Sequence, residues 1–177
     1  MAEEDAITIE ELIKKKAPNL SDKERQKQVE AIEKMFAEGV PLKETLNITP
    51  DVLEFLYSQG NRFYLLRKYQ EAARFFQMLF LLNPIDARYA FGVAASYQML
   101  KDYDQAISWY IVLMIIDQES PLPPYHASDC FLKKGDKDSA LLFLKKTLER
   151  IGDKKEYAPL KERASRMMAP LEKEVAK

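Results

Sequence analysis

The stretch ARYAFGVAASYQMLKDYDQAISWYIVLMIIDQES, residues 87–120, is the middle copy of a repeat with a period of about 34 residues. Residues 53–86 before it and residues 121–154 after it carry residues of the same kind at the same positions. The recurring columns are Ala72, Ala106 and Ala140; Gly60, Ala94 and Ser128; Phe63, Tyr97 and Phe131; and Phe76, Tyr110 and Leu144. A fixed period of about 20–50 residues is the signature of a repeat protein.

Each copy is predicted to form two antiparallel helices. The small residues of the columns lie where paired helices approach closely, and the large apolar residues fill the space between pairs. One pair cannot bury its own apolar face, so neighbouring pairs must stack. The predicted helices are residues 50–66, 69–82, 87–100, 103–117, 123–134 and 137–150. We therefore expect an all-α fold of three helix pairs between an N-terminal helix and a C-terminal capping helix.

Capping signals and proline residues set the predicted boundaries. Thr49 and Pro50 suit the start of the first repeat helix, because threonine caps helices and proline fits their first turn. Ser21 and Glu24 have capping-box spacing, which begins an upstream helix. The predicted parts are residues 1–20, a tail with a short helical segment near 9–17; 21–48, the N-terminal helix; 49–152, the three repeats; and 153–177, the capping helix and tail.

The composition limits the classes of function. Lys and Arg number 27 against 28 Asp and Glu, and a net charge of −1 argues against nucleic-acid binding, which usually brings a basic excess. The single cysteine, Cys130, excludes an internal disulfide. An acidic start and short apolar runs argue against a secretory signal and a membrane span. We predict a soluble cytoplasmic protein that binds no nucleic acid and does not insert stably into membranes.

His126 and Cys130 are the residues closest to a metal-binding pattern. They are four residues apart on one predicted helix, and Asp129 could join them, but a structural metal site needs four ligands and the chain has no other histidine. We favour ordinary packing and surface positions for all three. The sequence also lacks a Ser-His-Asp set, a phosphate loop and a dinucleotide fingerprint. The prediction is a protein without catalytic activity, metal or cofactor.

The first helices of the stacked pairs are expected to line a concave groove. Tyr57, Phe91 and Tyr125 share one position, the fifth, of the three copies, and an exposed row of aromatic rings usually marks a partner site. The competing interpretation is that flanking helices cover this row as core. The predicted peptide-binding residues are Tyr57, Asn61, Tyr64, Leu65, Phe91, Ala95, Gln98, Met99, Tyr125, Asp129 and Leu132.

Four stretches resemble a known family. They are ITPDVLEFLYS at residues 48–58, DARYAFG at 86–92, PYHASDCFLKKG at 124–135 and the stripe from Tyr157 to Leu171. The units resemble tetratricopeptide repeats, and over roughly residues 21–172 the chain resembles the class II chaperones of bacterial type III secretion. The resemblance implies that the helix pairs form a right-handed superhelical array.

The resemblance also implies a function. In this family a non-enzymatic cytoplasmic chaperone keeps hydrophobic translocator proteins soluble, and an extended segment near the translocator's N-terminus lies in the concave groove. Members often self-associate through their N-terminal helices. For this chain, that implies a homodimer contact formed by Val29, Ile32 and Phe36.

Other functions compete with this one. An adaptor for the charged C-terminus of a heat-shock chaperone needs a clamp of basic residues for carboxylates, and the inner face offers little beyond Arg88 and Lys133. A scaffold subunit of an envelope or pilus complex would usually bring a signal or lipid anchor. The sequence favours the secretion chaperone, with a generic tetratricopeptide scaffold or adaptor as the alternative.

Overall fold

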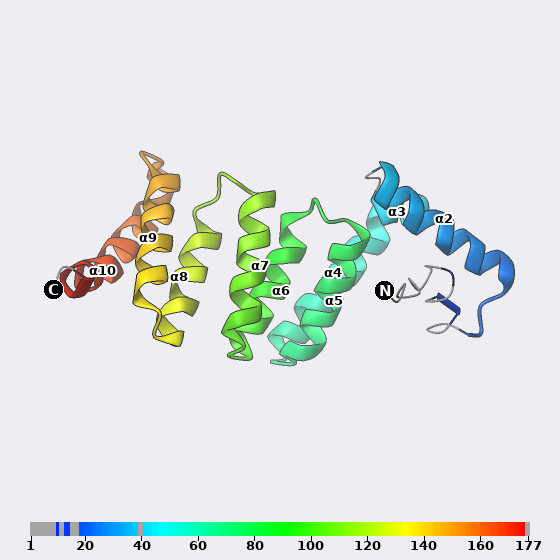
Figure 1. The fold of residues 1–177 in the computed structure, drawn as a ribbon, viewed down its shortest axis with the longest axis horizontal. Helices are drawn as coiled ribbons and strands as arrows, with labels where there is room; N and C mark the ends of the chain where they lie inside the picture. Colours follow the sequence, from blue (N-terminus) through cyan, green and yellow to red (C-terminus); the bar gives the residue numbers. More distant parts are fainter. Residues whose placement is uncertain (1–9, 11–12, 15–17, 39–40, 176–177) are drawn as a thin grey trace, which may run out of the picture. The chain divides into compact units, whose positions relative to one another are not determined.

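The computed structural model describes residues 10, 13–14, 18–38 and 41–175, and the regular structure of these residues is helical (Figure 1). The helices are α2 (Asp22–Glu38), α3 (Leu42–Thr45), α4 (Pro50–Leu65), α5 (Tyr69–Leu82), α6 (Ala87–Met99), α7 (Tyr103–Ile116), α8 (Leu122–Lys134), α9 (Lys137–Ile151), η1 (Lys155–Tyr157) and α10 (Ala158–Val175). The predicted all-α fold class is confirmed. The six repeat helices begin and end within one residue of the predicted spans.

The chain divides into two compact units, Met1–Leu53 and Glu54–Lys177. In the first unit, the predicted capping box begins α2: the Ser21 backbone N–H donates to a Glu24 carboxylate oxygen at 3.0 Å, and the Glu24 N–H donates to Ser21 Oγ. The Ser21 hydroxyl also donates to the same carboxylate at 2.6 Å, and this bond and the one from the Ser21 N–H lower the pKa of Glu24. Most of the predicted tail, residues 1–20, lies outside the described residues.

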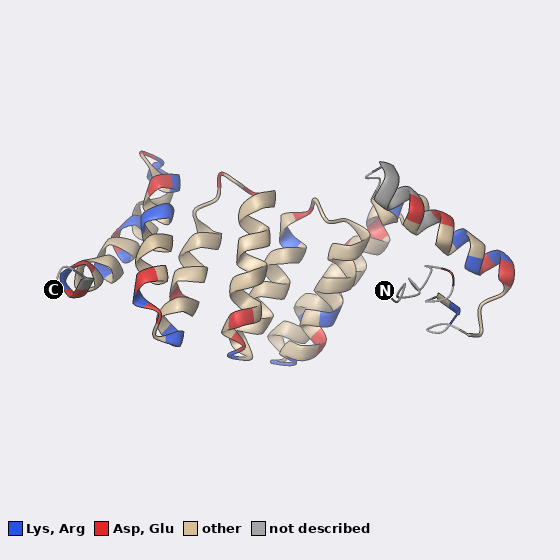
Figure 2. Ribbon diagram, viewed as in Figure 1, with Lys and Arg blue, Asp and Glu red and all other residues tan. Residues whose placement is uncertain are grey.

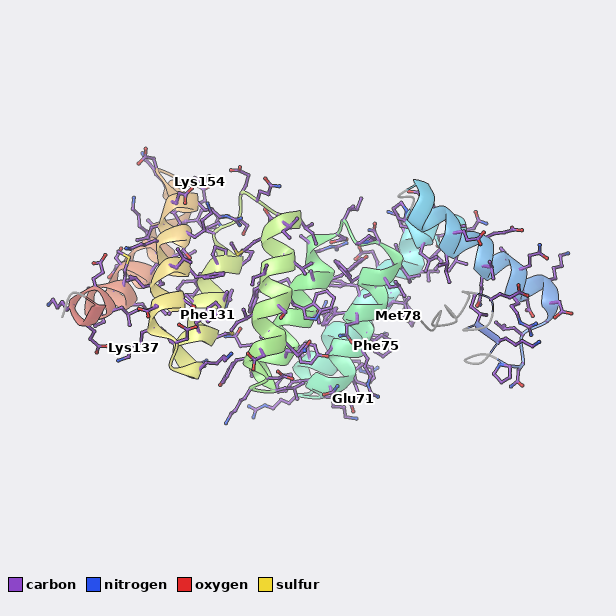
Figure 3. The ribbon with its side chains drawn as sticks, in the orientation of Figure 1. Glu71, Phe75, Met78, Phe131, Lys137 and Lys154 are labelled. Atoms are coloured by element: carbon purple, nitrogen blue, oxygen red, sulfur yellow. The ribbon has the colours of Figure 1, made fainter. Side chains whose placement is uncertain are left out.

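In the second unit, each helix packs against the next one along the chain from α5 to α10 (Figure 1). Aromatic pairs join the helices within a repeat. Phe63 of α4 lies 5.1 Å from Phe75 of α5 between ring centroids, and Phe131 of α8, labelled in Figure 3, lies 5.0 Å from Phe143 of α9. Both pairs belong to the same two columns of the repeat, so the sequence period is also a packing period.

The turn inside each pair repeats as well. Arg67, Lys101 and Gly135 lie one repeat apart from one another, and all three have the left-handed backbone conformation, with φ of 59°, 63° and 83°. In each copy the N–H of the following residue donates to the backbone carbonyl of the aromatic residue five positions earlier, which is Phe63, Tyr97 or Phe131. A left-handed residue at this place is a common way to end a helix.

The small-residue columns are the tightest part of the core. Ala72, Ala106 and Ala140 are fully buried, as are Ala94 and Ser128 of the other column. At the C-terminal end, Ala164 and Leu171 of α10 join the α9 residues of a separate core cluster, so α10 covers the last repeat. Among the described helices, none is long and apolar enough to cross a bilayer.

Candidate functional site

The first helices of the three repeats, α4, α6 and α8, lie side by side. An Arg88 Nη2 on α6 lies 2.6 Å from a Glu54 carboxylate oxygen on α4. Gln98 of α6 donates to the Asp129 carboxylate of α8 at 2.8 Å. The three helices therefore present one continuous face. Few charges lie near its middle: α6 contains a single charged residue, Arg88, and so does the adjacent helix α7, Asp104 (Figure 2).

An open cavity of about 250 Å³ lies on this face. Two of the predicted aromatic anchors, Tyr57 and Phe91, line it together although they come from successive repeats. The lining residues are Tyr57, Ala87, Arg88, Phe91, Leu113, Asp117, Ser120, Leu122 and Pro123. The walls are mainly apolar, so the cavity suits an apolar side chain of a bound segment.

Arg88 is the one cation among these residues, and two carboxylates compensate its charge. Its Nη2 lies 2.6 Å from Glu54 and 2.7 Å from Asp86, and the guanidinium carbon lies 4.9 Å from the Tyr57 ring centroid. Hydrogen bonds to these carboxylates raise the pKa of Arg88, and its hydrogen bond lowers the pKa of Asp86. The guanidinium thus lies over the Tyr57 ring and forms part of the cavity wall. Because it is already paired with two carboxylates, it is poorly suited to bind a carboxylate of a partner.

The aromatic anchors make equivalent contacts in the first two repeats. The Tyr57 ring lies 5.8 Å from that of Phe76, and the Phe91 ring lies 6.1 Å from that of Tyr110, the counterpart of Phe76 in the next repeat. Phe91 also packs against the buried core cluster that contains Tyr110, and Tyr125 packs against the cluster that contains Leu144, the counterpart of Tyr110 in the third repeat. Both anchors are therefore partly core, which agrees in part with the competing interpretation.

A polar chain crosses the other half of the face. The Tyr110 hydroxyl donates to Gln98 Oε1 at 2.7 Å, the Gln98 amide donates to Asp129, and Lys133 Nζ also lies 2.7 Å from Asp129. Burial raises the pKa of Tyr110, so this hydroxyl remains a donor. The structure thus brings two predicted residues, Gln98 and Asp129, into direct contact.

The remaining predicted positions are less enclosed. Asn61, Ala95 and Tyr64 are half-buried, and the Tyr64 ring lies 5.3 Å from that of Tyr69. Leu65 and Met99 are 80% and 47% exposed, and neither lines the cavity. In α2, Val29 and Ile32 are half-buried, while the side chain of Phe36 lies outside the described residues.

Several cavity residues are absent from the sequence-based prediction; some, such as Ala87 and Leu122, lie on first helices, and others lie outside them. Leu113 comes from α7, a second helix, and Asp117 and Ser120 come from the connection to the third repeat. The length of the connection between Ile116 and Leu122 could have been noticed, but it does not show which way the connection folds. His126, treated above as ordinary packing, lies beside Phe91 at 5.6 Å between ring centroids.

Cys130 is buried next to this face, and burial raises the pKa of its thiol to about 12. The thiolate is the reactive form of cysteine, so this residue is chemically inert at neutral pH. Within the described residues, no group of three or more His, Cys, Asp or Glu side chains is placed to hold a metal ion.

Comparisons with known proteins agree with this architecture. The tetratricopeptide repeat family matches residues 53–86 and 89–119. The chain is 36% identical over 138 residues to Low calcium response locus protein H of Yersinia pestis, covering 78% of this chain and 82% of that protein. It also matches the structure of the type III secretion chaperone SycD of Yersinia enterocolitica in complex with a peptide of the translocator YopD. In that match the TM-score is 0.68 and the identity 35%, over 72% of this chain and 97% of the other.

The chain belongs to the type III secretion translocator chaperones. A second solved member of this chaperone family, PcrH of Pseudomonas aeruginosa, matches in complex with the chaperone binding region of PopD. That match has a TM-score of 0.68 and 31% identity, over 72% of this chain and 96% of the other. The resemblance deduced from the four sequence stretches is therefore confirmed for the translocator-chaperone family.

Proposed function

We propose that this chaperone binds an apolar, extended segment of a hydrophobic translocator protein along the face formed by α4, α6 and α8. The cavity shared by Tyr57 and Phe91 carries the proposal, because it offers apolar walls across two successive repeats. The translocator peptides bound to SycD and PcrH support the same class of partner. The protein would act in the bacterial cytoplasm, by binding rather than by catalysis, and would keep its cargo soluble before secretion.

The expected affinity of a short segment is modest. Each well-buried apolar anchor contributes about 1.5–3 kcal/mol. Each ordered side chain costs about 0.5–1.5 kcal/mol, in addition to the loss of overall freedom. We therefore expect an isolated peptide to bind at roughly micromolar Kd, with the rest of the translocator adding contacts elsewhere.

Calorimetry with a synthetic YopD peptide, corresponding to the segment bound by SycD, tests the proposal. Tyr57→Ala and Phe91→Ala should each weaken binding about tenfold or more, because each removes a wall of the cavity. Leu142→Ala is the matched control, since Leu142 is 64% exposed on α9 and does not line the cavity. Circular dichroism confirms that each variant is folded.

Two results would contradict the proposal: no binding by the wild-type chain, or wild-type affinity in both aromatic variants. Salt dependence separates the secretion chaperone from an adaptor with a charged clamp. Apolar anchoring should leave the Kd nearly constant as salt rises, whereas a clamp of charged groups weakens through screening.

We further propose that α2 forms a homodimer contact through Val29, Ile32 and Phe36. Val29 and Ile32 lie one turn apart and are half-buried. Replacing both with Glu should shift a dimer to a monomer in analytical ultracentrifugation without changing the helical signal of the repeats. An unchanged sedimentation coefficient would exclude α2 from the interface.

A further inference from the structure

His126 breaks the pattern of the repeat at a place where the other copies carry small residues. The equivalent positions are Ser58 in the first repeat and Gly92 in the second. Gly92 must be small, since a Cβ there would lie 2.5 Å from the Phe76 ring. The third copy carries a titratable ring at this position, and departures from a local rule often mark functional sites.

The imidazole of His126 lies among three aromatic rings. It stacks on Tyr110 of α7, with centroids 5.5 Å apart and an interplanar angle of 15°. The Phe91 and Tyr125 rings meet it at near right angles, at 5.6 Å and 5.5 Å. His126 therefore lies between the second and third aromatic anchors of the proposed binding face. Phe91 also lines the cavity, so a segment that runs from the cavity along the face toward Tyr125 would cover His126.

The charged groups near His126 are Asp129 and Lys133 of its own helix. Asp129 is already engaged, because its Oδ2 accepts from Lys133 at 2.7 Å and from Gln98 of α6 at 2.8 Å. From α7 the facing titratable group is the Tyr110 hydroxyl, and on α8 it is the Cys130 thiol; burial raises the pKa of both, so both are neutral. Within the described residues, no carboxylate hydrogen-bonds to the imidazole. Burial, opposed by Asp129 and assisted by Lys133, lowers the pKa of His126.

We propose that His126 makes translocator binding proton-linked: the face accepts an apolar side chain against Phe91, His126 and Tyr125 while the imidazole is neutral, and loses affinity when the imidazole is protonated. The inference rests on the proposed function and names a specificity-determining residue for it. The chemical class that fits this place is an uncharged, apolar side chain.

Water removal gives the direction of the effect. A bound apolar side chain displaces water from the ring, which disfavours the charged form, and Asp129 is not free to compensate it. The pKa of His126 is therefore lower in the complex than in the free protein, and binding at a pH between these two pKa values releases a proton. Because one group titrates, the affinity changes by at most about tenfold per pH unit.

The first test measures the pKa of His126 directly. The chain has one histidine, so the imidazole signals in an NMR titration of the tag-free protein belong to His126. The titration is run without and with a saturating amount of the YopD peptide. A lower pKa in the complex is expected, and an unchanged or higher pKa overturns the proposal.

The second test compares the Kd of the same peptide at about pH 7.5 and about pH 5.5, which bracket the usual range of histidine. In the wild-type chain we expect affinity to fall at least about threefold more than in His126→Phe, which keeps a ring, and in His126→Gln. Comparison with these variants removes any titration of the peptide itself. Equal pH dependence in all three proteins overturns the proposal.

Failure of the proton linkage and failure of the proposed function give different experimental results. If the peptide binds but His126 does not respond, the proton linkage is wrong and the proposed function stands. If the wild-type chain does not bind the peptide, the proposed function is contradicted and the linkage with it.

Discussion

The two junctions between repeats bury an equivalent aromatic ring in different ways. Between the first and second repeats, the fully apolar ring of Phe76 lies directly over the backbone of Gly92. Between the second and third, the equivalent ring, Tyr110, stacks on the side chain of His126 and donates its hydroxyl to Gln98. Both rings are buried, with exposures of 2% and 0%.

Positions that are equivalent in the repeat can therefore be stabilised by different interactions. The first junction is held by shape, because the missing Cβ of Gly92 makes room for Phe76. The second is held by shape and by a polar chain from Tyr110 through Gln98 to Asp129. We expect the first junction to be sensitive to added volume and the second to lost hydrogen bonds.

The largest expected effect is that of Gly92→Ala. In an open helix this change stabilises by about 0.5–1 kcal/mol, but here the new methyl would meet the Phe76 ring at 2.5 Å. Overpacking of a buried site costs about 1–3 kcal/mol, so we expect a net loss of stability in urea denaturation.

Gly60→Ala is the matched control for that prediction, because its Cβ would meet only the edge of the same ring, at 2.9 Å. It should cost less than Gly92→Ala. Replacing the Phe76 ring by the smaller side chain of leucine, in Phe76→Leu, should reduce the loss of stability caused by Gly92→Ala. A stabilised Gly92→Ala variant would show that the first junction is not held by close approach.

Tyr110→Phe should have a smaller effect at the second junction. It keeps the stacked ring but removes the hydroxyl donor to Gln98 Oε1 at 2.7 Å. The loss of one such hydrogen bond costs about 1 kcal/mol of unfolding free energy. An unchanged denaturation midpoint would show that the polar chain does not stabilise this junction.

The smallest expected effect is that of Arg88→Gln, which removes the ion pair with Glu54 of α4 and the one with Asp86, the cap of α6. Arg88 and Glu54 are half exposed, with side-chain exposures of 47% and 55%, so the pair is worth about 0.2–1 kcal/mol and less at high salt. The lowered pKa of Asp86 means that its contribution is present above the unfolded pKa of the carboxyl and is lost as pH falls through the folded value.

Thermal melts at low and high salt, at neutral pH and well below about pH 4, the ordinary range of an Asp carboxyl, measure this contribution. The difference between the wild-type chain and Arg88→Gln should shrink in salt and in acid. A difference that persists in acid would mean that the role of Arg88 lies in its packing over the Tyr57 ring.

The sequence by itself determined the all-α fold, the helix spans and the tight columns such as Ala72, Ala106 and Ala140, because a packing contact that recurs once in every repeat must appear as a recurring residue type. The same period indicated Tyr57 and Phe91 as neighbours on one face. A contact that is formed in the same way in every repeat leaves a periodic residue pattern, so it can be predicted from the sequence.

Only the tertiary structure shows the contacts that differ from one repeat to the next. Leu113 of α7 and Asp117 and Ser120 of the connection after it reach the cavity beside Tyr57 of the first repeat, and Ala164 and Leu171 of α10 complete the core of the last pair. The partner of His126 is Tyr110, which belongs to a different helix and a different repeat. Such contacts depend on how whole helices pack, and no spacing along a single helix specifies them.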